Sequence, residues 1–296
     1  MSLAVAPQFR VRRGEPLSRH TSWHVGGPAE VFFSPGSRAE LAAFLRALPA
    51  GVPVEFIGLG SNLLVRDGGI PGVVISLHGT LDELKRLTDT TVQAGAGVAC
   101  ARIARSCIKW GLGPAEFFAG IPGTLGGALA MNAGAFGGET WRHVLAVETI
   151  DRSGVTHERG AADYRIGYRE VVALHGGEWF LSARLSFEQR PGAHEGEVKV
   201  LLARRKASQP IGQWSCGSVF VNPPGDHAAR LIESAGLKGY RIGGASVSVK
   251  HANFIINHGE ARAADIERLI EHVRASVAQL HGVTLRTEVR VLGVPA

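Results

Sequence analysis

The sequence predicts an α+β protein of two or three domains. Its 296 residues are more than one core of ordinary size usually supports. Strand-like runs and glycine loops dominate the first two thirds of the chain, and clear helical patterns come late, which is an α+β order. Glycine, at 39 residues, is nearly twice its usual share of about 7% and is concentrated in a few runs. Such runs indicate that the backbone turns sharply or closely approaches another group.

Two helices and a strand are predicted in the first 110 residues. Ser37 and Glu40 form a capping box for the first helix, and Pro49 ends it. Its apolar residues are Leu41, Phe44, Leu45 and Leu48. The run at 54–60 predicts a buried strand that opens into a loop, and a second helix is predicted around 100–110.

Two further helices and a last strand are predicted near the C-terminus. The first helix spans 226–235, with Gly236 as its cap, and the second spans 263–280, with Gly282 after it. The apolar face of the second helix consists of Ile266, Leu269, Ile270, Val273 and Val277. A strand is predicted at 284–292, with alternation that puts Leu285, Thr287, Val289 and Val291 on one face and Arg286, Glu288 and Arg290 on the other.

Composition narrows the class of ligand. The net charge of +6 and the pI near 9.6 favour an anionic partner, but the positive charge is spread thinly and no nucleic-acid-binding motif is present. We therefore expect an anionic small molecule. The three cysteines form no CxxC pair, and we expect a reduced, cytoplasmic setting with Cys100 and Cys107 as buried small hydrophobes. Neither a metal motif nor a signal or membrane segment is predicted.

Two glycine-rich loops suggest binding of a diphosphate. Gly58 and Gly60 follow an apolar run and precede Ser61 and Asn62, an arrangement that leaves backbone amides free to form an anion-binding nest. The run at 117–139 contains seven glycines. Neither loop is a Walker A motif or a Rossmann fingerprint. Tight turns alone would explain an isolated glycine pair, but they explain two long runs less well.

At this point the chain resembles a known family. GLGSNLLVRD (58–67), EFFAGIPGTLGGALAMNAGAFGGE (116–139), GSVFVNP (217–223), AARLIESAGLKG (228–239), HANFIIN (251–257) and LRTEVR (285–290) resemble, in this order, motifs of the UDP-N-acetylenolpyruvoylglucosamine reductases. The resemblance implies a vanillyl-alcohol-oxidase-type FAD-binding unit of two subdomains and a C-terminal α+β substrate-binding domain. The short spacing from Asn222 to His251 implies the compact subclass, which lacks the tyrosine-bearing lid.

The resemblance also implies boundaries and partners. Subdomain 1 is expected at 1–57, completed by the tail 290–296, subdomain 2 at 58–192, and the substrate-binding domain at 193–289; the polar stretch 189–197 suits a boundary. The implied cofactor is non-covalently bound FAD, with NADPH as hydride donor and a nucleotide sugar as substrate. We expect a monomer that binds neither nucleic acid nor a membrane.

The implied cofactor residues all lie in the two glycine-rich loops. They are Gly58, Leu59, Gly60, Ser61, Asn62, Leu63, Gly120, Ile121, Pro122, Gly123, Thr124, Gly126, Gly127, Ala128, Asn132, Ala133 and Gly134.

Three catalytic residues are implied by the same resemblance. Arg169 would bind the substrate carboxylate with two parallel hydrogen bonds, and Arg165 is its nearest rival. Ser218 matches the proton donor and has no GxSxG elbow around it. Glu288 matches the third residue, and its protonation state stays open because flanking arginines and burial act in opposite directions.

Tyr168, Lys206, Asn222 and His251 are the implied substrate-binding residues. The sequence departs from the family pattern at Val171, where a serine is frequent, and at Val221, where a lysine is frequent. Two other functions remain open: a related flavoprotein oxidase that passes electrons to oxygen, and a basic binding protein without catalysis. Bleaching of the flavin by NADPH separates the reductase from the oxidase, and a colourless protein indicates the third.

Overall fold

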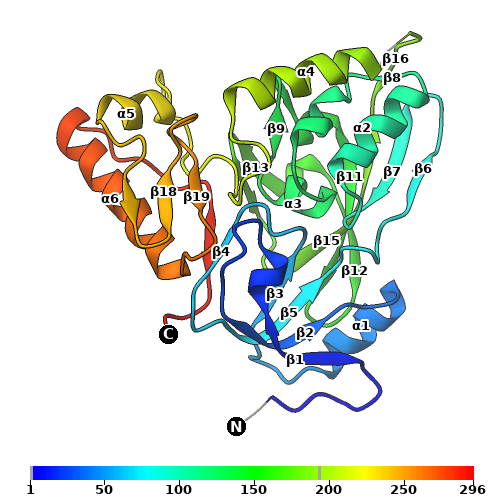
Figure 1. Cartoon of the computed structure of the whole chain (residues 1–296). Helices are drawn as coiled ribbons and strands as arrows, with labels where there is room; N and C mark the ends of the chain where they lie inside the picture. Colours follow the sequence, from blue (N-terminus) through cyan, green and yellow to red (C-terminus); the bar gives the residue numbers. More distant parts are fainter. Residues whose placement is uncertain (1–2, 193–194) are drawn as a thin grey trace. The chain divides into compact units, whose positions relative to one another are not determined.

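The computed structural model describes residues 3–192 and 195–296 (Figure 1). Its chain divides into two compact units, each assembled from separate segments. Unit 1 combines Met1–Val11, Phe32–Leu59 and Val74–Ala203, whereas unit 2 combines Arg12–Val31, Gly60–Val73 and Arg204–Ala296. Among the described residues, no helix combines the length and apolar character that crossing a membrane requires.

Unit 1 is built on an antiparallel five-stranded sheet. Its strand order is β12-β11-β15-β7-β6, with bounds Thr156–Arg159, Val144–Asp151, Glu178–Ser186, Thr91–Gly95 and Leu84–Arg86. Helices α2 (Cys100–Lys109) and α3 (Leu125–Ala130) cover one face of this sheet (Figure 1). Sheet residues such as Val92 and Leu185 join Ile103 and Leu129 of these helices in one core.

Small hairpins and 3-10 helices extend this unit. The antiparallel strand pairs are β8 (Leu112–Gly113) with β16 (Glu188–Gln189), β9 (Gly134–Ala135) with β10 (Gly138–Glu139), and β13 (Tyr164–Gly167) with β14 (Glu170–Ala173). The 3-10 helices span Glu116–Gly120, Thr140–His143 and Ala161–Asp163; a fourth, Leu17–His20, lies in unit 2.

The N-terminal part of the chain forms a four-stranded sheet and one helix. The sheet has the order β1-β2-β5-β3, with bounds Val11–Pro16, Pro28–Phe33, Ile70–Ser76 and Val54–Ile57. The predicted first helix is confirmed as α1 (Arg38–Ala47), and Phe44 stacks on Phe33 with ring centroids 3.9 Å apart. The predicted buried strand at 54–60 is shorter, ending at Ile57, the only residue of β3 that is fully buried.

The capping of α1 differs in part from the prediction. Ser37 Oγ accepts the Glu40 amide at 3.1 Å, as a capping box requires. The Glu40 carboxylate, however, accepts the amide of Gly36 at 2.6 Å, one residue before the expected donor. The Glu40 side chain therefore completes the cap by accepting the amide of Gly36 instead of the amide of Ser37.

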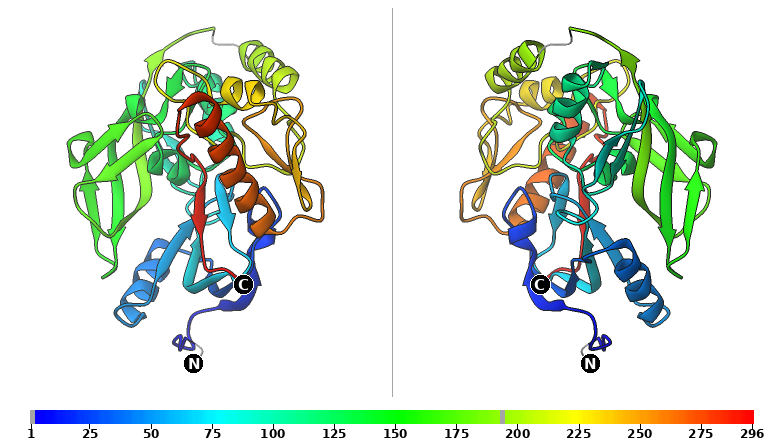
Figure 2. Two further views of the ribbon diagram at one scale, coloured as in Figure 1. Left: turned by 90° about the vertical axis from the view of Figure 1, so that its left-hand side faces the viewer. Right: turned by 90° about the vertical axis from the view of Figure 1, so that its right-hand side faces the viewer.

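Unit 2 contains the two late helices and two small sheets. Helices α5 (Ala228–Ser234) and α6 (Ala263–His281) pack with the antiparallel sheet β17-β18-β19, whose strands span Arg241–Ile242, Ala245–Val247 and Ile255–Asn257. The apolar face predicted for α6 is entirely buried, and Gly282 ends the helix at φ +67°. β20 (Arg290–Leu292) runs parallel to β4 (Leu63–Val65), as the red and cyan strands of Figure 2 show.

Two expected boundaries are corrected. The helix predicted from Asp226 begins at Ala228, because His227 has an extended backbone and Asn222 Oδ1 accepts the Ala228 amide. Of the strand predicted at 284–292, only the last three residues are strand. Leu285 and Val289 are buried as the alternation predicts, but Thr287 makes only an isolated bridge, with Phe220.

The helix α4 (Glu195–Ser208) was not predicted, because its apolar residues do not recur on one face. Val200 and Leu202, for example, are apolar but exposed. It begins inside the polar stretch 189–197 that suggested a boundary, of which residues 193–194 lie outside the described part of the chain.

The loop after β4 is anchored to α6. The Asp67 carboxylate accepts the amides of Ala263 and Ala264 at 3.0 Å each, and Arg66 pairs with Glu267 at 2.6 Å. Amides in the first turn of a helix have no partners inside the helix, and the positive end of the helix dipole attracts a carboxylate. The Arg-Asp pair that ends the motif at 58–67 therefore holds this loop in place.

Candidate functional site

The loop that leads into α3 presents backbone amides. Cys100 donates to Gly123 O and Leu125 donates to Val98 O, both at 2.9 Å, which pairs Ala99 with Thr124 as in an antiparallel sheet. In this pairing the Thr124 amide points away from Ala99. Within the described chain, the amides of Gly123 and Thr124 donate no hydrogen bond. These two donors are therefore available to an anionic ligand.

Two glycines of the predicted cofactor loops, Gly58 and Gly120, lie too close to other residues to carry a side chain. A Cβ on Gly58 would lie 2.5 Å from Thr124 Oγ1, and one on Gly120 would lie 2.5 Å from Ala135 Cβ. A Cβ on Gly127, in contrast, would meet nothing within 4 Å, and this residue is exposed. The first two glycines are thus explained by the protein itself. Gly127 leaves open space beside the backbone, which suits a ligand that approaches it closely.

Arg169 lies on the same loop system. It occupies the two-residue turn between β13 and β14 at φ +56°, a conformation that is rare for a residue with a long side chain. Its guanidinium donates to Asn132 O at 3.4 Å and to Gly134 O at 2.8 Å, and Asn132 also has a positive φ of 45°. The Arg169 guanidinium lies 5.3 Å from the ring centre of Tyr168, whose side chain is exposed. The rival Arg165 is exposed on β13.

The part of the first loop that belongs to unit 2 is tightly packed. Gly60 has φ +62°, and a Cβ there would lie 1.9 Å from His20 O. The Cys216 thiol lies 3.4 Å from Leu63 O and 3.6 Å from Gly60 O. Residues 60–63 therefore lie directly against the chain that leads to Ser218.

Ser218 and Glu288 are brought together by backbone hydrogen bonds. The Glu288 amide donates to Val219 O at 2.8 Å, and Asn62 Nδ2 donates to Glu288 O at 2.9 Å. Ser218 is half-buried between Gly217, at φ +71°, and the buried Val219. The structure records no hydrogen bond between Ser218 and any described residue, which leaves its hydroxyl available to a ligand.

The predicted substrate residues of unit 2 have different surroundings. Asn222 Oδ1 caps the start of α5. Burial lowers the pKa of His251, aided by the charge of Lys238, so that the imidazole is neutral at neutral pH. His251 Nδ1 accepts the Asn253 amide at 3.3 Å, which assigns the ring proton to Nε2. Lys206 is exposed at the end of α4, and its carbonyl accepts Lys250 Nζ at 2.5 Å.

The cysteines are structural. Cys100, Cys107 and Cys216 are free and buried, as the sequence predicted for the first two, and burial raises the pKa of each thiol to about 12. Among residues 3–192 and 195–296, no cluster of three or more His, Cys, Asp or Glu side chains could hold a metal ion.

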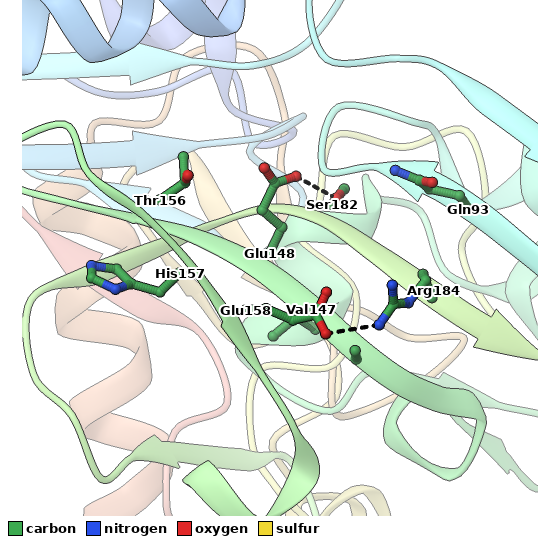
Figure 3. A pocket seen from close by; sticks show the side chains of 9 residues that line it. Gln93, Val147, Glu148, Thr156, His157, Glu158, Ser182 and Arg184 are labelled. Atoms are coloured by element: carbon green, nitrogen blue, oxygen red, sulfur yellow. Dashed lines mark hydrogen bonds and ion pairs between the residues drawn. The ribbon is translucent and has the colours of Figure 1, made fainter.

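A polar cavity of about 220 Å³ lies on the five-stranded sheet (Figure 3). Its charged side chains bond to other protein groups: Glu148 accepts Ser182 Oγ at 3.0 Å, and Arg184 donates to Glu158 at 2.9 Å. None of its lining residues is a predicted site residue. We therefore assign this cavity no role in ligand binding.

The structure thus groups the predicted residues in two clusters. In unit 1, Arg169 contacts Asn132 and Gly134 of the glycine-rich loop, and in unit 2, Glu288 contacts Asn62 and the residue after Ser218. Within residues 3–192 and 195–296, no hydrogen bond or ion pair joins the Lys206 side chain to Asn222 or His251. Asn253, which contacts the Ser218 segment, was missed. A polar residue inside the apolar run of HANFIIN should have indicated a buried hydrogen-bonding role.

Comparisons with known proteins cover nearly the whole chain. The family model described as an FAD binding domain matches residues 29–160, and the one described as the C-terminal domain of UDP-N-acetylenolpyruvoylglucosamine reductase matches 209–292. The UDP-N-acetylenolpyruvoylglucosamine reductase of Alkalilimnicola ehrlichii is 60% identical over 286 residues, covering 96% of this chain and 95% of that protein. The enzyme of Methylococcus capsulatus is 55% identical, covering 94% of this chain and 92% of its own.

A solved structure agrees. The crystal structure of UDP-N-acetylenolpyruvylglucosamine reductase from Thermus caldophilus superposes with a TM-score of 0.82 at 35% identity, covering 96% of this chain and 100% of that one. The predicted fold class, an FAD-binding unit with a C-terminal α+β domain, is confirmed. The chain therefore belongs to the UDP-N-acetylenolpyruvoylglucosamine reductase family.

Proposed function

We propose that this chain reduces UDP-N-acetylglucosamine enolpyruvate to UDP-N-acetylmuramate with NADPH, through bound FAD, with Ser218 as proton donor. Family membership makes it an FAD-dependent UDP-N-acetylmuramate dehydrogenase that acts in peptidoglycan precursor synthesis. The observation that carries the assignment of roles is the hydrogen-bonded contact of the Ser218 segment with Glu288, and of Glu288 with Asn62 of the predicted cofactor loop.

The glycine-rich loops fit an FAD diphosphate. The available amides of Gly123 and Thr124 and the open space beside Gly127 are features that a closely bound anion uses. We assign FAD binding to the residues of the two loops predicted from the sequence. When bound, FAD supplies the redox chemistry by taking hydride from NADPH and passing it to the substrate. The protein residues bind, orient and protonate the substrate.

Arg169 is assigned to the substrate carboxylate. Negative charge grows on this carboxylate as the enolpyruvyl group accepts hydride, so a fixed cation stabilises the transition state more than the ground state. The carbonyls of Asn132 and Gly134 hold the guanidinium and its turn in place. A guanidinium that is already oriented needs little rearrangement during the reaction, and this is consistent with the strained backbone at Arg169.

Ser218 and Glu288 are assigned to the protonation step. A serine hydroxyl is a weak acid, so it can serve only because the enolate it protonates is strongly basic. Its proton passes to the substrate carbon next to the one that accepts hydride, and a neighbouring group or a water chain must neutralise the alkoxide that is left. Glu288 would lie against the developing enol and stabilise it.

Tyr168, Lys206, Asn222 and His251 are assigned to the rest of the substrate. A neutral His251, with its proton on Nε2, would donate a hydrogen bond to the sugar or diphosphate without adding charge. Lys206 would supply charge to the diphosphate, and its proximity to Lys250 supports a local positive potential. Val221 is apolar, so its side chain cannot supply the charged contact that a lysine at this position would make.

The subclass, the domain boundaries and the monomeric state are part of the proposal. The segment between Asn222 and His251 contains α5, β17 and β18 and leaves no room for a further domain, which supports the compact subclass. We propose FAD-binding subdomains at 1–57, with 290–296, and at 58–192, and a substrate-binding domain at 193–289. The C-terminal family match at 209–292 supports this order.

The function is tested by an anaerobic spectrum of the purified yellow protein. NADPH should bleach the flavin, and subsequent UDP-N-acetylglucosamine enolpyruvate should restore the oxidised spectrum. Bleaching without recovery would contradict the proposed substrate. Recovery with oxygen alone would indicate an oxidase.

Gly127→Ala should weaken FAD binding without destabilising the apoprotein. The added methyl group would meet no protein atom within 4 Å, so any penalty arises from the ligand. We expect the Kd for FAD, measured by fluorescence titration, to rise at least about tenfold. Gly176→Ala is the matched control, because a Cβ there also meets nothing within 4 Å and this glycine lies outside the predicted loops. Equal Kd values in the two variants would remove Gly127 from the cofactor site.

Lys206→Ala should mainly raise the KM for the nucleotide sugar. An exposed ammonium that binds a diphosphate contributes ground-state and transition-state binding alike, so kcat should change little. We expect an increase in KM of about tenfold in steady-state assays. Lys199→Ala, also exposed on α4, is the control and should leave KM unchanged. An unaltered KM in Lys206→Ala would exclude Lys206 from the diphosphate site.

A further inference from the structure

The buried side chain of Asn253 makes the same pair of hydrogen bonds to a backbone segment that a neighbouring strand would make. Only 3% of it is exposed. Its Oδ1 accepts the Phe220 amide at 2.9 Å, and its Nδ2 donates to Phe220 O at 2.8 Å. One side chain therefore satisfies both backbone groups of a residue two positions after Ser218, as a strand would do.

The main chain of Asn253 strengthens the same contact. Its carbonyl accepts the Val219 amide at 2.9 Å, so that the three hydrogen bonds from Asn253 hold two consecutive residues. On the other side, Val219 O accepts the Glu288 amide at 2.8 Å, and the Val221 amide donates to Arg286 O at 2.9 Å. The segment 219–221 is thus held from both edges.

The segment 219–221, which is held by hydrogen bonds on both edges, begins immediately after Ser218. Val219 and Phe220 are buried and paired, whereas Ser218 is half-buried and makes no hydrogen bond with a described residue. Gly217, on the other side, has φ +71° and a Cβ there would meet nothing within 4 Å. The position of the Ser218 hydroxyl is therefore controlled from its C-terminal side, where Asn253 acts.

We propose that Asn253 is a positioning residue for protonation of the substrate by Ser218. Without its side chain, the amide and the carbonyl of Phe220 lose their partners in a buried place, and the backbone shifts to find others. Because the angle of a proton donor to its acceptor governs its efficiency, a small shift slows the step. This inference rests on the proposed function and adds a residue that acts through Ser218.

The test compares the two half-reactions in the FAD-loaded enzyme by anaerobic stopped flow. In Asn253→Ala, we expect reoxidation of the reduced flavin by the enolpyruvyl substrate to slow by about 10- to 100-fold, within the range of acid catalysis. Reduction by NADPH should change less than about threefold. Asn253→Asp keeps the acceptor for Phe220 but loses the donor, so we expect a smaller loss, and this variant serves if the alanine variant does not fold.

Asn257→Ala is the matched control. Asn257 is 5% exposed, lies in the same motif and also bonds to backbone, donating to Trp23 O and accepting from Gly259 and Ala261. Its loss should lower the thermal unfolding midpoint by as much as the loss of Asn253, without a selective effect on reoxidation. A similar selective effect in both variants would overturn the proposal.

A double-mutant cycle with Ser218→Ala separates positioning from general damage. If Asn253 acts through Ser218, Asn253→Ala should slow the residual reoxidation of the Ser218→Ala enzyme less than about threefold. Independent, multiplying losses would overturn the proposal. If the substrate reoxidises the wild-type flavin normally and Asn253→Ala has the same kinetics, the role of Asn253 is overturned but the proposed function is not. Failure of the wild-type protein to be reoxidised by the substrate would instead overturn the proposed function.

Discussion

In Ser218→Ala, NADPH should still bleach the flavin at nearly the wild-type rate, whereas the enolpyruvyl substrate should no longer restore the oxidised spectrum. The reason is that hydride and proton arrive on two neighbouring carbons, and without the proton the enolate returns its hydride. The expected loss of reoxidation rate is at least 100-fold, within the about 10²- to 10⁴-fold range of positioned acids. Anaerobic stopped-flow absorbance, with each half-reaction recorded separately, measures it.

Ser215→Ala is a suitable comparison, because Ser215 is a half-buried serine three residues earlier in the same segment. It should leave both half-reactions unchanged. Loss of flavin reduction as well as reoxidation in Ser218→Ala would show that the serine supports the fold or cofactor binding, and the proton-donor assignment would fail.

Glu288→Gln should slow reoxidation by a factor of about 100 or more, the size expected for a positioned acid or charge. Glutamine has nearly the shape of glutamate, and the hydrogen bonds of Glu288 to Val219 and Asn62 involve only its backbone. The substitution therefore removes the ionisable group while leaving those contacts in place. Single-turnover reoxidation is the measurement, with flavin reduction as the internal reference.

Glu271→Gln, on the exposed part of α6, controls for a general effect of lost negative charge. This variant should reduce and reoxidise its flavin at the wild-type rates. Near-normal turnover in Glu288→Gln would make Glu288 a structural residue and leave Ser218 and Arg169 as the remaining candidates.

Several features of this protein follow from the sequence alone. The helix α6 can be predicted because the five residues of its apolar face recur with helical spacing and Gly282 can adopt the left-handed conformation that ends it. Leu285 and Val289 are buried as alternation predicts. The order of the motifs predicted the FAD-binding and C-terminal domains that the family models match.

Other features depend on contacts between distant segments. The stretch at 284–292 forms a strand only where β4 lies beside it, because a ladder needs a partner along its whole length. The local pattern around Asn253 can indicate a buried hydrogen-bonding role, but it does not identify the partner, Phe220, which is 33 residues away. The hydrogen bonds of Arg169 to the carbonyls of Asn132 and Gly134 likewise join segments 37 and 35 residues apart. Periodicity and capping are local energies that the sequence expresses directly, whereas hydrogen-bond partners between distant segments exist only once the chain is folded.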